Sequence, residues 1–550
     1  MTDYPHIHYL KRLQDATRKY WDKPALNDVG GESYTFGQMA LTVEKLHCFF
    51  DAAGIRKGDH IAISAANGSH WGMAYVSVIT AETVVVPILN DFLPDNVAFL
   101  TAHSDSVGLF TNAEKWNKMD AGDIPGLRFV IDVDDWTLLY AADEAVRKAY
   151  EGRDAVFAER HPGGYKARDV VFPETPPDDL AMINYTSGST GNPKGVMLTN
   201  RNFTATVDYC QYKMPVGDAM VSMLPMAHMY GLMIEFVYPV CNGTSIYWLG
   251  KAPTPAALMK AFSEVHPYLL ISVPLVMEKI FKGKIKPTLD KPAVKFLSKV
   301  PGLNQIVFKK VREGLLTAFG GNVREFIFGG APFNPEVEKW LKRIKFPYCV
   351  GYGMTEANPL LAYEYARLYK MGSCGRPVDC TTVRIDSEDP QNVVGEIQAK
   401  GDNICIGYYK NEEATRNAFT PDGYLRTGDL GIMDSDGFIF IKGRSKFMIL
   451  SANGQNIYPE EVEAVVNNQS YVAESVVVDR GGKLVALVYL DQKAMEKAGL
   501  GEGDVAGVLE NIRVAANHKL PVYSKIMKVE NRTEPFEKTP KMSIKRFLYR

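Results

Sequence analysis

One glycine-rich stretch constrains the fold of this chain more than any other: residues 185–195, which read YTSGSTGNPKG. The run before it, 180–183, is short and apolar and predicts a buried strand, and the apolar pattern resumes at 196–199. Asn200 is a suitable cap for a helix over 202–209. Between strand and helix, glycines let backbone N–H groups converge, hydroxyl side chains add donors, and a lysine adds positive charge. The stretch therefore predicts a cradle for phosphate.

The spacing of this stretch excludes a Walker A loop, which needs a second glycine five residues after the first and then Lys-Ser or Lys-Thr. Here the fifth residue after Gly188 is Pro193, and Gly195 follows Lys194. A glycine-rich loop alone is also compatible with a surface turn. The eleven residues in this order are more specific, and they resemble the phosphate-binding signature of the adenylate-forming superfamily: acyl-CoA synthetases, luciferases and the adenylation domains of peptide synthetases. The resemblance implies that Lys194 is catalytic. It implies that ATP and AMP are bound by Thr186, Ser187, Gly188, Ser189, Thr190 and Gly191.

Composition sets the broad class of the protein. A chain of 550 residues with 46% hydrophobic residues can bury large cores and suggests three or four domain-sized units. The net charge of −2 gives no global field that would favour nucleic acid or an anionic membrane. The seven cysteines are odd in number and contain no CxxC pair, which predicts free thiols rather than a disulfide framework or a zinc site.

The N-terminus has neither the basic nor the apolar region of a secretory signal. The most apolar segment, 74–89, is interrupted by polar residues and is too short to span a bilayer. We therefore expect a soluble, cytoplasmic protein without a transmembrane segment, for which peripheral contact with a membrane stays open.

Alternating patterns predict an α/β fold. Residues 34–53 and 71–81 have helical spacing, whereas 60–64, 84–88 and 107–111 are short apolar strands. This alternation predicts a parallel, doubly wound sheet. The same alternation of strand-like and helix-like segments recurs over residues 220–350. We therefore expect a second doubly wound α/β subdomain and a ligand crevice between the strand ends.

The sequence pattern changes in the C-terminal third of the chain. Short strands with Gly/Asp turns over about 372–442 predict a small β subdomain. A boundary falls at 444–447, and 448–550 reads as a separate α+β domain whose strands are joined at Gly481 and Gly482. The predicted organisation is an AMP-binding domain over 1–443, a hinge at 444–447 and a mobile domain over 448–550.

A second glycine-bearing loop, residues 351–356 (GYGMTE), would be an ordinary turn by itself. Beside the phosphate stretch it resembles the nucleotide loop of the same superfamily, which implies that Tyr352 lies against adenine, Thr355 contacts the α-phosphate and Glu356 holds Mg²⁺. An aromatic face suits a purine, and a carboxylate suits Mg²⁺ that bridges phosphates. Residues 329–332 (GGAP) resemble the adenine-side loop. The other implied nucleotide contacts are Gly330, Ala331, Pro332, Gly353 and Met354.

Residues 424–429 (YLRTGD) resemble the motif whose aspartate binds the ribose hydroxyls. An ionised carboxylate only accepts hydrogen bonds, so Asp429 can accept from both hydroxyls at once. Arg444 falls where the family has a second ribose contact.

Residues 224–231 (LPMAHMYG) resemble the acyl-side motif of the superfamily, which implies that His228, Tyr230 and Gly329 border the acid. A lone histidine is more often a core residue or half of a metal site, but no second ligand has metal-like spacing, so zinc is disfavoured. Relatives that activate amino acids carry an aspartate in this region, and 228–231 has no acid. A carboxylic acid with an uncharged tail is therefore preferred.

The C-terminal motifs agree less well with the superfamily. Lys446 falls on the hinge position, followed by Phe447 where an acid or amide is common, and Gly454 and Gln455 fall in the loop that lines the CoA tunnel. Relatives carry a C-terminal lysine that bridges acid and α-phosphate, but here alignment puts Ser543 at that position. Lys541 and Lys545 lie two residues to either side, on the same face of an extended loop. Either could substitute, or adenylation could be slow.

The resemblance covers nearly the whole chain and implies a two-step ligase that uses ATP, Mg²⁺ and CoA. The expected acid is a medium- or long-chain fatty acid. An aryl-CoA ligase and an acyl-AMP ligase that loads a carrier protein are rival interpretations. A nucleotide-binding regulator without turnover is a third, because of Ser543.

Overall fold

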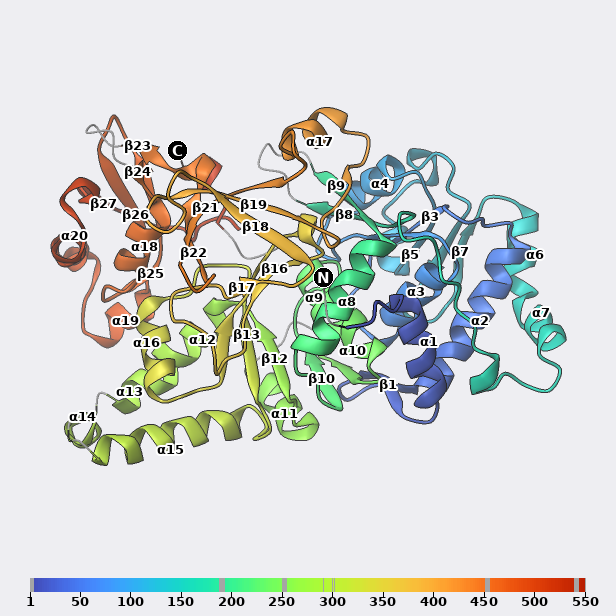
Figure 1. Cartoon of the computed structure of the whole chain (residues 1–550), viewed down its shortest axis with the longest axis horizontal. Helices are drawn as coiled ribbons and strands as arrows, with labels where there is room; N and C mark the ends of the chain where they lie inside the picture. The colour runs from blue at the N-terminus through green and yellow to red at the C-terminus, as the bar shows by residue number, and fades with distance from the viewer. Residues whose placement is uncertain are drawn as a thin grey trace.

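The computed structural model describes residues 4–186, 193–249, 255–289, 291–298, 300, 302–450, 456–538 and 544–549. Figure 1 shows an elongated molecule with the N-terminal elements at one end and the C-terminal elements, in orange and red, at the other. The elements of the middle of the chain lie between these two ends.

The largest sheet in the described residues belongs to the N-terminal half. Strands β3, β4, β5, β6 and β8 run parallel, while β7 and β9 pair antiparallel at either side. In spatial order its strands are β20 (Gly407–Tyr408), β9 (Lys194–Thr199), β8 (Leu180–Thr186), β4 (Val84–Pro87), β3 (His60–Ile63), β5 (Ser106–Thr111), β6 (Phe129–Asp132) and β7 (Leu138–Ala141). The predicted parallel sheet is therefore present, with antiparallel strands added at its edges.

Helices surround this sheet, and their bounds follow from local sequence. The longest begins with a capping box in which Thr35 and Gln38 each accept a backbone hydrogen bond from the other, at 2.8 and 3.1 Å. Its apolar residues, from Phe36 to Phe50, are buried in the core. The helices of this half are α1 (Tyr9–Lys19), α2 (Phe36–Ala52), α3 (Ser69–Thr80), α4 (Pro94–His103), α5 (Ala113–Trp116), α6 (Glu144–Glu151), α7 (Arg153–Arg160) and α8 (Asn200–Lys213).

The region 220–350 forms two sheets rather than one. Strand β10 pairs with β11, and β11 pairs with β1 from near the N-terminus, whereas β12, β13 and β14 form a separate parallel sheet. Their bounds are β1 (Pro24–Asp28), β2 (Ser33–Thr35), β10 (Ala219–Ser222), β11 (Ser245–Trp248), β12 (Leu269–Ser272), β13 (Glu325–Phe328) and β14 (Tyr348–Val350). The helices are α9 (Met229–Gly231), α10 (Tyr238–Cys241), α11 (Pro255–Val265), α12 (Pro274–Ile280), α13 (Lys286–Leu289), α14 (Pro292–Leu297), α15 (Leu303–Ala318) and α16 (Pro335–Arg343), with π-helical turns η3 (Leu232–Val237) and η4 (Phe281–Ile285). The expected second α/β subdomain is therefore present, and one of its two sheets includes β1, a strand distant in sequence.

Antiparallel strands follow, as their alternating pattern predicts. The sheet β18 (Thr381–Asp386), β19 (Gly395–Gly401), β21 (Leu425–Met433) and β22 (Ile439–Arg444) lies beside the short strands β15 (Tyr352–Gly353), β16 (Leu360–Tyr363) and β17 (Arg376–Pro377), with helix α17 (Glu412–Ala418). The chain then passes through the 3-10 turn η6 (Ser445–Phe447) into elements with a hydrophobic core of their own, around Val462, Val488 and Ile512. These elements are β23 (Ile449–Leu450), β24 (Asn456–Ile457), α18 (Pro459–Asn467), β25 (Val472–Asp479), β26 (Leu484–Leu490), α19 (Gln492–Lys497), α20 (Val505–Lys519) and β27 (Lys528–Arg532).

Among the described residues, two ion pairs connect this last unit to the rest of the protein. Lys442 lies 3.3 Å from the Glu461 carboxylate, and Lys519 lies 3.6 Å from that of Glu336. Interfaces of this polar kind between parts of one chain are typical of units that move relative to one another.

Candidate active site

The phosphate stretch connects two antiparallel strands. Strands β8 and β9 are paired up to Thr186 and Lys194, and the Thr186 hydroxyl lies 3.5 Å from the Lys194 carbonyl oxygen. A Cβ on Gly195 would lie 2.8 Å from Ile183, so only glycine fits this register. The sequence pattern alone did not separate strand β9 from the following helix. The predicted contacts Ser187, Gly188, Ser189, Thr190 and Gly191 lie outside the described residues.

The helix after β9 begins at Asn200, two residues before the predicted start at 202. Thr199 is the N-cap of α8, and its backbone N–H donates to Asn202 Oδ1 at 2.8 Å. The prediction of Asn200 as the cap is therefore wrong by one position. Asn200 instead takes part in the helix and accepts a hydrogen bond from the Tyr9 hydroxyl at 3.2 Å.

Tyr408, which the sequence did not single out, contacts both Lys194 and Glu356. The Tyr408 hydroxyl donates to Glu356 Oε1 at 2.9 Å, and Lys194 Nζ lies 5.0 Å from the centre of the Tyr408 ring. Glu356 is buried, and its carbonyl accepts from the Cys405 N–H at 2.8 Å. Tyr408 lies on β20, a two-residue strand that pairs with β9, and no charge or spacing in the sequence distinguishes it.

Asp429 lies in a second cluster close to the first. Its carboxylate accepts a hydrogen bond from the Tyr352 hydroxyl and forms an ion pair with Arg444 Nε, each at 2.8 Å. Burial raises the pKa of Asp429, Arg444 and Tyr352 oppose that rise, and Glu356 and Lys446 also act on it electrostatically. The predicted nucleotide residues Tyr352, Glu356, Asp429 and Arg444 and the predicted hinge residue Lys446 are therefore brought together.

The short turn that carries Thr355 and Glu356 is fixed by close backbone packing. A Cβ on Gly353 would lie 2.0 Å from the Pro359 carbonyl oxygen, and the Met354 N–H donates to that same oxygen at 2.8 Å. Thr355 is buried in this turn. Glycine is therefore required at 353 for packing.

The acyl-side motif contacts both nucleotide loops. The Tyr230 hydroxyl donates to the Ile327 carbonyl at 3.2 Å, and a Cβ on Gly329 would lie 3.2 Å from the Tyr230 ring. Asn184, on the strand that leads into the phosphate stretch, donates to the Ala227 carbonyl at 3.0 Å. His228 is half-buried next to these contacts. Gly330, Ala331 and Pro332 follow Gly329 and are exposed.

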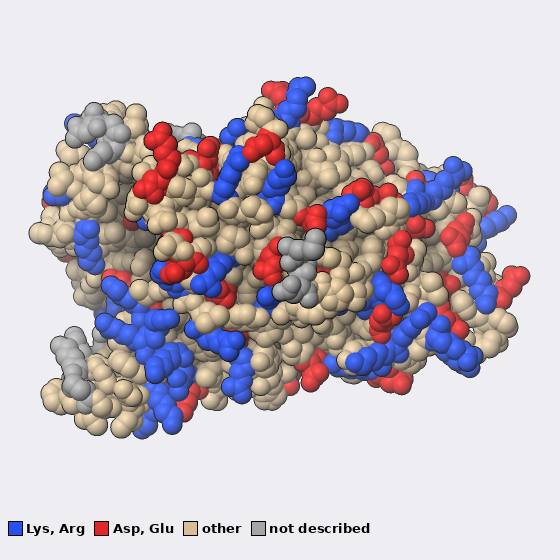
Figure 2. All heavy atoms as spheres, viewed as in Figure 1, with Lys and Arg blue, Asp and Glu red and all other residues tan. Residues whose placement is uncertain are grey.

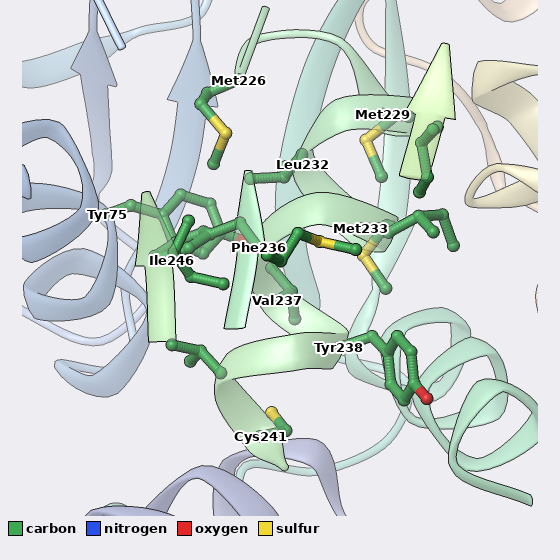
Figure 3. Close-up of a cluster of buried hydrophobic side chains, with 14 of the residues drawn as sticks. Tyr75, Met226, Met229, Leu232, Met233, Phe236, Val237, Tyr238, Cys241 and Ile246 are labelled. Carbon is green, nitrogen blue, oxygen red and sulfur yellow. The ribbon is translucent and has the colours of Figure 1, made fainter. Parts of the chain in front are cut away.

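Apolar side chains gather behind Tyr230. Figure 3 shows that they come from the turn after β10 and from α9, η3 and neighbouring strands. The members nearest the acyl-side motif are Met226, Met229, Leu232, Met233 and Phe236, all of them buried. Methionine is unbranched and adapts its shape to its neighbours. This methionine cluster is therefore an adaptable part of the packed core beside the acyl-side motif.

A buried glutamate on η3, Glu235, contacts the start of the acyl-side motif. Glu235 Oε2 accepts from the Ser222 hydroxyl and from the N–H groups of Met223 and Leu224, at 2.9–3.0 Å. Burial raises the pKa of Glu235 to about 8, and these hydrogen bonds oppose the rise. The sequence did contain a signal, since Glu235 is the only acid between 219 and 263. The Glu235 carboxylate holds the start of the acyl-side motif against the end of β10 through these hydrogen bonds.

We expect stability to depend on pH through Glu235. Because its folded pKa is about 8 against an ordinary 4.5, the folded protein keeps a proton that the unfolded chain has lost. Stability from this group is complete below pH 4.5 and falls by at most about 1.4 kcal/mol per pH unit up to pH 8. Glu235→Gln should therefore flatten the decline in melting temperature between pH 5 and pH 8. Equal slopes for both proteins would contradict this.

The C-terminal residues form their own contacts. Lys446 Nζ lies 4.9 Å from the centre of the Phe447 ring, and the Arg546 guanidinium lies 5.2 Å from the same ring while it pairs with the buried Glu463. Lys545 lies 3.4 Å from the Glu537 carboxylate. The predicted residues Lys541, Ser543, Gly454 and Gln455 lie outside the described residues.

No helix in the described part of the chain is both long and apolar enough to cross a bilayer. Each of the seven cysteines has a free thiol.

Two curated proteins are similar to most of the chain. The chain is 27% identical to a long-chain fatty acid–CoA ligase of Mycobacterium bovis, over 90% of this chain and 86% of the relative. It is 28% identical to the peroxisomal long chain acyl-CoA synthetase 7 of Arabidopsis thaliana, over 89% of this chain and 73% of the relative.

Solved structures of ligases share the fold. The anthranilate CoA ligase AuaEII in complex with anthranoyl-AMP superposes with a TM-score of 0.79 at 17% identity, over 100% of this chain and 98% of that one. The o-succinylbenzoate CoA synthetase of Bacillus subtilis, solved with ATP and magnesium, gives a TM-score of 0.72 at 20% identity and covers 99% of both chains.

Two family models account for most of the length. Residues 13–409 match the AMP-binding enzyme family, and residues 447–549 match the C-terminal domain of AMP-binding enzymes. The chain therefore belongs to the AMP-binding enzymes, the adenylate-forming family that its glycine-rich stretch resembles.

Proposed function

We propose that this chain is an ATP-dependent acyl-CoA synthetase for a medium- or long-chain fatty acid. In the first step the acid's carboxylate attacks the α-phosphorus of ATP, forming acyl-AMP and releasing pyrophosphate. In the second step the CoA thiolate attacks the acyl carbonyl and releases AMP. The observation that carries the proposal is that the acyl-side motif touches both nucleotide-binding segments. Asn184, on the strand that leads into the phosphate stretch, donates to the Ala227 carbonyl, and Gly329 of the adenine-side loop lies against the Tyr230 ring.

The charged side supplies what adenylation requires, which is two anions held together while charge gathers on the phosphate oxygens. Lys194 at the end of the phosphate stretch would neutralise part of that charge, and Thr355 would donate to the α-phosphate. The N–H groups and hydroxyls of Thr186, Ser187, Gly188, Ser189, Thr190 and Gly191 would bind the remaining phosphate oxygens. These roles follow from the resemblance, and the position of Lys194 beside Tyr408 and Glu356 supports them.

The residues present fit a magnesium ion carried by the nucleotide. No group of three or more acids, histidines or cysteines that could hold a metal occurs in the part of the chain that the structure describes. Mg²⁺ in phosphate-transfer sites commonly takes one or two carboxylates and completes its shell with phosphates and water. Glu356, buried and oriented by Tyr408, is the carboxylate in position to hold it. When bound, the ion would neutralise charge on the phosphates.

Asp429 would bind the ribose. An ionised carboxylate offers about four acceptor positions, and Tyr352 and Arg444 occupy two of them. Two positions therefore remain for the two ribose hydroxyls. Tyr352 would lie against adenine, with Gly330, Ala331, Pro332, Gly353 and Met354 around the base.

The acid side supports an uncharged tail. His228, Tyr230 and Gly329 would border the carboxyl group, and the methionine cluster would receive the chain. Residues 228–231 contain no acid that could pair with an amine, and Oε2 of the nearby buried Glu235 accepts hydrogen bonds from the N–H groups of Met223 and Leu224. The long-chain fatty acid ligases among the relatives support the same acid class.

The second step requires that the C-terminal unit turn about Lys446, which would bring Gly454 and Gln455 to the CoA tunnel. A C-terminal lysine would serve the first step. Lys541 and Lys545 are the candidates, with Ser543 at the family's lysine position. Ion pairs between the two parts of the molecule, Lys442–Glu461 and Lys519–Glu336, are of a kind that can break and re-form during such a movement.

The proposal is tested by acid-dependent pyrophosphate release across saturated acids of increasing length, with benzoate and anthranilate for comparison. Each methylene buried in the apolar cluster contributes about 0.8 kcal/mol, so kcat/KM should rise about threefold to fourfold per added methylene until the pocket is full. Release of AMP and thioester should require CoA.

Three results would instead support a different protein class. A preference for the aromatic acids would favour an aryl-CoA ligase. Acyl transfer only to a carrier protein would favour an acyl-AMP ligase. ATP binding without pyrophosphate release would favour a nucleotide-binding regulator.

A further inference from the structure

One segment differs in charge from the rest of the protein. Residues 274–324, which connect β12 to β13, contain eleven Lys and Arg but three Asp and Glu, in a chain whose net charge is −2. The segment comprises α12, η4, α13, α14 and α15. An excess of positive charge of this size on one connecting segment indicates an anionic partner.

The outer end of this segment exposes apolar side chains. Phe296 on α14 is 69% exposed, and Ile306 and Leu303 on α15 are 55% and 43% exposed. Leu303 and Ile306 are three residues apart and so share a helix face, and α14 is in contact with α15. Single exposed apolar residues are ordinary, but three large ones on two adjoining helices form a patch. These three residues are called the apolar tip.

Lysines border the apolar tip. Lys309 and Lys310 follow Ile306 on the same face of α15, and Lys286 and Lys291 precede α14. All four side chains are exposed, and of these only Lys309 has an ion pair among the described residues, with Glu313 at 3.8 Å. Figure 2 shows Lys and Arg crowded over α13, α15 and α16. These four lysines are called the basic collar.

We propose that the apolar tip and the basic collar dock this enzyme on an anionic lipid bilayer. The tip enters the acyl-chain region, and the collar binds headgroup phosphates. Helices that lie in a membrane interface combine these two features: an apolar face, and Lys or Arg along its border. A polyanion such as RNA could use the collar and stack on Phe296, but it would leave aliphatic Leu303 and Ile306 without a partner. The apolar tip therefore favours lipid.

The segment is also well placed for an acid that partitions into lipid. It leaves β12 through Val273, whose side chain lies 3.9 Å from the Cβ position of Gly330, and it returns through β13 to Gly329. The docking surface is thus built on the two strands that carry the acyl and adenine side of the site. The docking itself rests on exposure and charge and stands whether or not the acid is a fatty acid.

Sedimentation with vesicles tests the proposal, using phosphatidylcholine with and without phosphatidylglycerol, at low and at physiological salt. Wild-type protein should bind the anionic vesicles at least tenfold more tightly than the neutral ones, and salt should weaken the binding. Lys309→Glu with Lys310→Glu should reduce affinity for anionic vesicles at least tenfold. Phe296→Ser with Ile306→Ser should also reduce it at least tenfold while leaving the salt dependence in place.

Matched controls lie elsewhere on the surface. Val171→Ser removes an apolar side chain that is also 69% exposed. Arg147→Glu with Lys148→Glu reverses two charges on α6, at the opposite end of the molecule (Figure 1). Both controls should bind vesicles as the wild type does. All variants should release pyrophosphate normally with a water-soluble acid, which separates a docking failure from a failure of the proposed function.

Several outcomes would overturn the proposal: no binding by the wild type, equal binding to neutral and anionic vesicles, or wild-type affinity in either double variant. Wild-type affinity in the serine variant alone would mean adsorption by charge, as to any polyanion. A Phe296→Trp variant gives an independent reading if a double variant does not fold. Its fluorescence should shift to the blue with anionic vesicles and be quenched by brominated lipid chains, and an unchanged spectrum would contradict insertion.

Discussion

Replacing Glu356 with glutamine is expected to lower kcat/KM for acyl-AMP formation by about 10²–10³-fold, or about 3 to 4 kcal/mol of transition-state stabilisation. Glutamine keeps the size of the side chain and an acceptor for the Tyr408 hydroxyl, which now donates at 2.9 Å, so the fold should persist. What is lost is the negative charge that would hold Mg²⁺ against the phosphates. Pyrophosphate release measured against magnesium concentration should show that the variant needs more magnesium for half-maximal rate.

Tyr408→Phe is the control for this result. It removes the hydrogen bond to Glu356 and keeps both the carboxylate and the aromatic ring below Lys194. A hydrogen bond from a neutral donor to a charged acceptor contributes about 1.5 to 3 kcal/mol, so kcat/KM should fall about tenfold to a hundredfold. The magnesium requirement should change less than in Glu356→Gln. An unaltered magnesium curve in the Glu356→Gln variant would remove Glu356 from the metal site.

Replacing Asp429 with alanine should raise KM for ATP by about 10²–10³-fold and leave KM for the acid nearly unchanged. Two hydrogen bonds from ribose hydroxyls to a buried carboxylate account for about 3 to 4 kcal/mol. Some loss of stability is also expected, because the buried Tyr352 hydroxyl would lose its acceptor at 2.8 Å. Initial rates with ATP and with acid varied separately measure the two constants.

Two further variants separate the causes. Asp429→Asn keeps an acceptor for Tyr352, so it should recover stability and only part of the ATP affinity. Arg444→Ala should have a smaller effect than either, because Arg444 is about half exposed and its pair with Asp429 is partly screened by water. If KM for ATP and KM for the acid rose together in Asp429→Ala, general misfolding would explain the result and a ribose contact would not.

The α/β fold and the family could be predicted because their signals are local. The alternation of apolar strands and helices marked β3, β4, β5 and α2, and the glycine pair at 481–482 marked the β25–β26 hairpin. The pairing of β1 with β11 could not be predicted, because the partners are more than 200 residues apart and either is apolar enough to pair elsewhere. Sheet partners of this kind depend on tertiary packing.

Within the candidate site, motif residues could be predicted and their supporting residues could not. Tyr352, Glu356, Asp429 and Arg444 belong to recognisable loops, and the structure brings them together. Tyr408 stands in no motif, and it reaches Glu356 only because β20 adds to the edge of the large sheet. The separate strand β9 could not be predicted for a similar reason, since a continuous apolar run does not distinguish a strand from the start of a helix.

The arrangement around Arg444 has a thermodynamic consequence. Arg444 faces Asp429 across β21 and β22, and the chain turns into η6 at the very next residue. If a turn of the C-terminal unit pulls Arg444 away, the nucleotide loses affinity, and linkage requires that a bound nucleotide resist that turn by the same factor. A nucleotide bound at Asp429 would then stabilise one orientation of the C-terminal unit, and release of AMP would free that unit to turn.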